Sequence, residues 1–93
     1  MSDNRVEGRF TVSNELGLHA RAAAGLVRAA EKFHCQIEIF QGRRLANAKS
    51  IMSLLTLEAV RGTELRIVAV GEDAQAAVSA IGEMVRNKFG EQR

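Results

Sequence analysis

The sequence contains no proline, tryptophan or tyrosine, and only one cysteine among its 93 residues. A single cysteine cannot form an internal disulfide, which favours a reducing cytoplasm as its location. With four phenylalanines as the only aromatic residues, single-stranded nucleic acid would find a poor stacking surface. Apolar runs are a few residues long, far below the ~20 needed to cross a bilayer. We therefore expect neither a nucleic-acid partner nor insertion into a membrane.

What is present is typical of a small globular protein. The chain is 46% hydrophobic and 26% charged, and its length suffices for one domain, which we expect over residues 1–93. The polar and charged segment from Met1 to Gly8 does not resemble a secretory signal. The net charge of +2 is compatible with an acidic protein partner as well as with nucleic acid, so charge alone does not define the partner.

Hydrophobic periodicity predicts four strands and three helices. Alternation of apolar and polar residues indicates strands, whereas a helical repeat with an apolar face indicates helices. The expected strands cover residues 6–12, 35–39, 44–46 and 64–70, and the expected helices cover 20–33, 50–55 and 74–85. Ser50 and Asp73 are good N-cap residues for the second and third helices. The order β-α-β-β-α-β-α predicts an α+β fold, an antiparallel sheet with helices on one face.

His19 stands where a loop becomes the first helix, just before Arg21. Backbone N–H groups lack intrahelical partners there, and the positive end of the helix dipole attracts anions. That end also disfavours a protonated imidazole, which leaves a ring nitrogen free as a nucleophile. Arg21 could hold a transferred phosphoryl group. The spacing alone is weak evidence, because a histidine at a helix start is usually a loop residue or a partial cap. His34, near the end of the same helix, fits a structural role.

Two motifs together resemble the HPr family, the histidine-containing phosphocarriers of the bacterial phosphotransferase system. The first is Gly17-Leu18-His19-Ala20-Arg21, and the second, Ala48-Lys49-Ser50-Ile51-Met52, follows at the family's spacing. The chain length, the element order and Gly71-Glu72-Asp73 before the last helix agree as well. The resemblance extends from about Val6 to Phe89.

The resemblance implies both a fold and a mechanism. The fold is an open-faced β-sandwich, with four antiparallel strands and three helices on one face. His19 would accept a phosphoryl group on Nδ1 from enzyme I, charged by phosphoenolpyruvate, and pass it to IIA domains of sugar permeases. Arg21 would help to hold the phosphate. The chain would then be a monomeric carrier rather than an enzyme and would need no cofactor.

The chain departs from the family pattern at two positions. Ala22 stands where members usually have proline directly after the arginine, which restores a backbone N–H and loosens the first turn. Leu16 stands where members often have a small polar residue, so a hydrogen bond to the imidazole would be absent. Both departures bear on the transfer rate and on the stability of phosphohistidine.

A second site is expected around Ser50. On its own, Ser50 is best explained as a helix cap, but its motif resembles the segment that HPr kinase phosphorylates in the members that have this kinase. Ile51, Met52 and Leu55, together with Ala20, resemble the surface that docks partners. Some of these apolar residues could instead belong to the core, as Leu54 does in our interpretation.

Other functions are open at this point. The chain could be a paralogue in a regulatory, nitrogen-type phosphorelay, with the same chemistry and different receivers. It could also be a regulatory module that binds a partner when Ser50 is phosphorylated, although such a module needs no histidine nucleophile. One cysteine and two histidines at these positions do not form a metal-ligand set, so we expect no metal site.

Overall fold

The computed structural model describes residues 4–93, so the first three residues of the polar segment that begins at Met1 lie outside the described part. The described chain forms an antiparallel sheet whose strand order is β1-β4-β2-β3. The strands are β1 (Arg5–Thr11), β2 (Gln36–Gln41), β3 (Arg44–Asn47) and β4 (Glu64–Val70). The helices are α1 (Ala20–Ala30), α2 (Ile51–Leu55) and α3 (Ala74–Arg86), followed by a short 3-10 turn, η1 (Lys88–Gly90).

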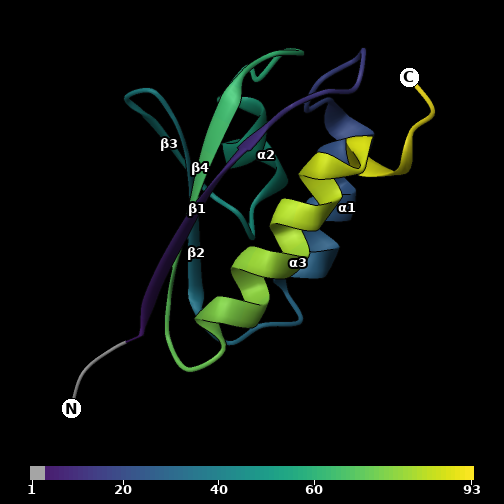
Figure 1. Ribbon diagram of the computed structural model, residues 1–93. Helices are drawn as coiled ribbons and strands as arrows, with labels where there is room; N and C mark the ends of the chain where they lie inside the picture. Colours follow the sequence, from purple (N-terminus) through teal and green to yellow (C-terminus); the bar gives the residue numbers. More distant parts are fainter. Residues whose placement is uncertain (1–3) are drawn as a thin grey trace.

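All three α-helices lie on one side of the sheet, with α1 and α3 packed against each other (Figure 1). Alternation along the strands explains this layering, because β4 turns Leu65, Ile67 and Ala69 toward the helices and buries each of them completely. The expected fold class, an open-faced sheet with helices on one face, is confirmed.

The predicted boundaries hold closely for the strands and less closely for the first helix. The structure assigns β4 the predicted residues, and a two-residue turn at Gly42 and Arg43 joins β2 to β3. However, α1 ends at Ala30, three residues before the predicted end, because the Phe33 N–H bonds to the Ala30 carbonyl at 3.1 Å in a tighter turn.

Two details of the helix faces differ from the expectation. A helical wheel over residues 20–33 predicts Ala20 on the apolar face of the first helix, but Ala20 is exposed, because it is the first residue of α1. Ala22, by contrast, is buried, with 4% of its surface exposed. The same wheel predicts Arg21, Arg28 and Lys32 on the opposite, polar face, and all three are exposed.

Asp73 occupies the N-cap position of α3, but its side chain makes no capping hydrogen bond. Its carboxylate instead accepts the backbone N–H groups of His34 at 2.8 Å and Cys35 at 2.9 Å. These bonds, the His34 one foremost, lower the pKa of Asp73 below its usual value. Asp73 thus ties the start of α3 to the segment between α1 and β2, at the end of α1 remote from His19.

Candidate functional site at the start of α1

His19 is the N-cap residue of α1, with extended backbone angles (φ −85°, ψ 178°). Its side chain makes no capping hydrogen bond and keeps 23% of its surface exposed. The first N–H groups of the helix therefore receive no acceptor from the His19 side chain. Because these groups have no carbonyl partners within the helix, the start of α1 offers donors to an anion.

Gly17 sets the direction of the loop that precedes His19. Its φ of +68° lies in the left-handed region, and a Cβ there would be 2.4 Å from the Ala59 carbonyl oxygen. The same carbonyl accepts the Leu18 N–H at 2.9 Å, so the loop is pinned to the segment between α2 and β4. Any side chain at position 17 would push this segment away.

Beside His19, a shallow cavity of about 300 Å³ is lined by residues of opposite charge, Arg21 and Arg93 against Glu15 and Glu91, together with Leu16. Leu16 is exposed there, with 65% of its surface accessible. Arg21 is exposed as well, so its guanidinium is available to an anion at this end of α1.

The C-terminal segment after η1 returns to this cavity, and Glu91 bonds to His19. One carboxylate oxygen of Glu91, Oε2, contacts His19 Nε2, and the other, Oε1, accepts the Asn14 side-chain N–H at 2.8 Å. These two hydrogen bonds, the one from His19 first, lower the pKa of Glu91 below its usual value. The imidazole thus does have a polar partner, which comes from position 91 and not from position 16.

No sequence motif points to Glu91 or Asn14. Glu91 lies 72 residues beyond His19 and 77 beyond Asn14, and no local motif surrounds it. Asn14 is fully buried, which is rare for an asparagine side chain, and it also donates to the Gly17 carbonyl at 2.8 Å. A buried asparagine beside a candidate nucleophile shows only in three dimensions.

The residues predicted around Ser50 lie on α2. Ser50 is the N-cap of this helix as expected, and its hydroxyl accepts the Ser53 N–H at 3.2 Å. Met52 exposes 75% of its surface and Ile51 39%, whereas Leu54 is fully buried. Leu55 is half-buried and packs against the core, so it contributes less free surface than its two neighbours.

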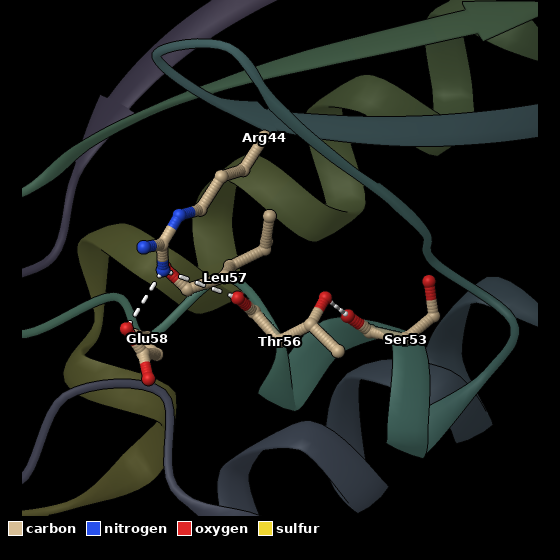
Figure 2. Close-up of polar contacts among 5 residues, drawn as sticks. All are labelled: Arg44, Ser53, Thr56, Leu57 and Glu58. Atoms are coloured by element: carbon tan, nitrogen blue, oxygen red, sulfur yellow. Dashed lines mark hydrogen bonds and ion pairs between the residues drawn. The ribbon is translucent and has the colours of Figure 1, made fainter.

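The C-terminal end of α2 is held by Arg44 of β3, as Figure 2 shows. Its guanidinium donates to the Thr56 carbonyl at 3.3 Å and to the Glu58 carboxylate at 2.8 Å. The Thr56 hydroxyl donates in turn to the Ser53 carbonyl at 2.6 Å. Both ends of this five-residue helix therefore have side-chain partners, which keeps Ile51 and Met52 in place.

The two predicted regions belong to helices that pack on each other, α1 and α2. His19, Ala20 and Arg21 begin α1, and Ser50, Ile51 and Met52 begin α2. No hydrogen bond joins the two groups within residues 4–93. His34 is exposed beyond the C-terminal end of α1. Residues 4–93 contain no cluster of three or more potential metal ligands.

Comparison with known proteins identifies the family. The sequence pattern described as the "PTS HPr component phosphorylation site" matches residues 6–87. The chain belongs to the HPr family. It is 43% identical over 86 residues to the phosphocarrier protein HPr of Xylella fastidiosa, covering 92% of this chain and 97% of the relative. It is 42% identical over 87 residues to the phosphocarrier protein NPr of Shewanella violacea, covering 94% and 96%.

The chain also resembles part of a longer HPr relative and a solved HPr structure. It is 40% identical over 91 residues to the multiphosphoryl transfer protein of Haemophilus influenzae, but this match covers 95% of the chain and only 18% of that protein. A crystal structure of HPr from Thermoanaerobacter tengcongensis superposes with a TM-score of 0.90 at 36% identity, covering 95% of this chain and 99% of that one. Within the described residues, no helix is long and apolar enough to span a membrane.

Proposed function

We propose that this chain is a phosphoryl carrier that accepts a phosphoryl group on Nδ1 of His19 from phosphoenolpyruvate-charged enzyme I and passes it to IIA domains of sugar permeases. The observation that carries the proposal is the position of His19: a partly exposed imidazole at the N-cap of an eleven-residue helix, with no capping hydrogen bond from its side chain. Family membership adds the expected chemistry.

The surroundings suit a phosphorylated imidazole. Phosphorylation adds negative charge and strong acceptor oxygens. The first-turn N–H groups of α1 and the exposed Arg21 guanidinium can meet this charge, each by a charge-assisted hydrogen bond. Arg21 therefore has the role of holding the phosphoryl group on the carrier without sealing it from the next acceptor.

We propose that the chain acts as a monomeric, single HPr-like domain in the cytoplasm, a carrier that forms a phosphohistidine intermediate without cofactor or turnover of its own. Its docking surface would combine Ala20 with Ile51, Met52 and Leu55 of α2, while the exposed Arg21, Arg28 and Lys32 steer acidic partners. Methionine suits such a surface because its flexible side chain adapts to several partners.

Ser50 would be the regulatory residue of this surface. Its hydroxyl lies beside the exposed Ile51 and Met52, so a phosphate placed there by an HPr kinase would put negative charge where partners dock. This same modification supports the alternative role of a regulatory binding module.

A nitrogen-type phosphorelay is the second candidate, because the identity to an NPr, 42%, equals that to an HPr, 43%, within one percentage point. Both candidates use His19 and differ only in donor and receiver. Purified sugar-type and nitrogen-type enzyme I and IIA proteins, offered in parallel, separate them. We expect faster transfer through the sugar-type pair. Faster transfer through the nitrogen-type pair would assign the chain to the second relay, and transfer through neither would reject the carrier function.

A further inference from the structure

Each oxygen of the Glu91 carboxylate has its own hydrogen-bond partner. Its Oε2 contacts His19 Nε2, and its Oε1 accepts the Asn14 amide N–H at 2.8 Å. The same Asn14 amide nitrogen donates its other hydrogen to the Gly17 carbonyl at 2.8 Å, and Asn14 is fully buried. Because the amide cannot turn without losing both bonds, it fixes the position of the carboxylate.

The backbone before and after Glu91 places this residue next to His19. Three consecutive residues, Lys88, Phe89 and Gly90, have φ values of 60°, 55° and 82°. Such a left-handed run is unusual, because two of the three residues are not glycine. Beyond it, the Glu15 N–H donates to the Arg93 carbonyl at 2.7 Å. The C-terminal segment is thus attached on both sides of Glu91.

We propose that Glu91 is a positioning residue for His19: its carboxylate orients the imidazole and keeps the proton on Nε2, so that Nδ1 is the unprotonated nitrogen that attacks phosphorus. This inference rests on the proposed phosphorylation of His19. An ionised carboxylate can only accept a hydrogen bond, so the shared hydrogen belongs to Nε2. In a neutral imidazole the other nitrogen then carries the lone pair. The lowered pKa of Glu91 keeps its carboxylate ionised at neutral pH.

The same contact assists the transfer step. The lone pair of Nδ1 forms the N–P bond while the bond from phosphorus to the leaving atom of the phosphorylated donor breaks, and that electron pair stays with the donor. The ring gains positive charge, which the Glu91 carboxylate stabilises through Nε2–H, as a carboxylate does beside a catalytic histidine in hydrolases. Both side chains are mostly covered, with 23% of His19 and 21% of Glu91 exposed, so solvent screens this attraction only in part.

The first test is the tautomer of His19, which requires no phosphoryl donor. Long-range ¹H–¹⁵N NMR of the imidazole in the full chain distinguishes a proton on Nε2 from one on Nδ1. We expect the Nε2–H form to dominate the neutral ring of the parent and a mixture of both forms in Glu91→Ala and Glu91→Gln, since a glutamine amide can donate as well as accept. Glu15→Gln removes the same charge at the same cavity without touching the ring and should leave the tautomer unchanged.

The second test is the rate of a single phosphoryl transfer from charged enzyme I to each variant. We expect a roughly 10- to 100-fold lower rate for Glu91→Ala, the loss expected for a charge-assisted hydrogen bond felt in the transition state, and the parent rate for Glu15→Gln. Backbone amide spectra show whether each variant is folded. If Glu91→Ala does not fold, the rate is measured on Glu91→Gln, which preserves the size of the side chain.

The two tests separate this inference from the proposed function. If the parent chain does not accept phosphate, the proposed function is rejected. The tautomer measurement still decides whether Glu91 positions the His19 ring. An unchanged tautomer and rate in the Glu91 variants would overturn the role of Glu91, and so would equal effects from Glu15→Gln.

Discussion

Replacing Ser50 separates its structural role from its proposed regulatory one. The Ser50 hydroxyl accepts the Ser53 N–H, a cap typically worth ~1 kcal/mol. Ser50→Ala should therefore lower the free energy of unfolding by about that amount, which corresponds to a Tm decrease of ~4–8 °C in a domain of this size. Aspartate caps as well as serine does, and its charge at a helix start adds ~0.3–1 kcal/mol, so Ser50→Asp should be as stable as the parent or slightly more stable.

The transfer rates should show the opposite order. A carboxylate at position 50 lies beside the exposed Ile51 and Met52, so it would face an incoming acidic partner at the docking surface. We expect Ser50→Asp to accept phosphate from enzyme I at least roughly 10-fold more slowly at low salt, because like charges brought together at an interface repel each other and about 1.4 kcal/mol suffices for a tenfold change in rate. The deficit should shrink with salt, since the screening length falls from ~30 Å at 0.01 M to ~3 Å at 1 M. Ser50→Ala should keep the parent rate.

Quenched-flow transfer at low and high salt, combined with thermal unfolding, measures both effects. Ser79→Asp is the matched control, because Ser79 is an exposed serine on α3, outside the proposed docking surface. It should transfer at the parent rate at either salt concentration. If Ser50→Asp and the parent accept phosphate equally fast at low salt, the regulatory role of Ser50 is refuted and the residue is a helix cap only.

Three further predictions concern the loop, the first turn and the core. Gly17→Ala should lose roughly 2–3 kcal/mol of stability, seen as a lower urea midpoint, because of its left-handed φ and the Ala59 carbonyl at 2.4 Å from the new Cβ; an unchanged midpoint would show that the loop relaxes freely. Ala22→Pro should unfold within a few degrees of the parent, because the third residue of a helix has no carbonyl partner for its N–H, yet alter phosphotransfer kinetics; a large drop in Tm would mean that this turn differs from that of the family. Burial, then Asp73, raises the pKa of Cys35 from 9.0 to about 11. The protonated thiol then stabilises the fold below pH 9, and this contribution is lost between pH 9 and 11. Iodoacetamide should label native Cys35 slowly at pH 8, and Cys35→Ala should weaken the decline in stability above pH 9; rapid labelling at pH 8 would contradict the raised pKa.

Much of the fold could be predicted from local sequence patterns. β4 is predicted to the residue because Leu65, Ile67 and Ala69 recur at a spacing of two on one side and because Gly62 and Gly71 lie near its two ends. Ser50 is a cap by local chemistry alone, and its hydrogen bond to Ser53 confirms the prediction. The end of α1 was predicted too late, because Phe33 continues the apolar pattern and still packs on the core after the helix has ended.

Contacts between distant segments account for what the sequence could not reveal. Asp73 has the residue type of a capping side chain, but the N–H groups of His34 and Cys35 lie within its reach and take its carboxylate. The partner of the His19 ring is Glu91, which depends on how α3 and η1 direct the C-terminal segment. Leu55 has the same apolar character as Met52, and only the packing of α2 decides that Leu55 is half-buried while Met52 is exposed.

Locating the phosphoryl group on the chain decides whether His19 is the residue that carries it. The chain would be incubated with enzyme I and phosphoenolpyruvate, and ³¹P and ¹⁵N NMR would locate the phosphorus. We expect about one acid-labile phosphate per chain, on Nδ1 of His19, present in His34→Ala and absent in His19→Ala, as for a histidine nucleophile at a helix start. Label that persists in His19→Ala, or a phosphate on another residue, would contradict this expectation.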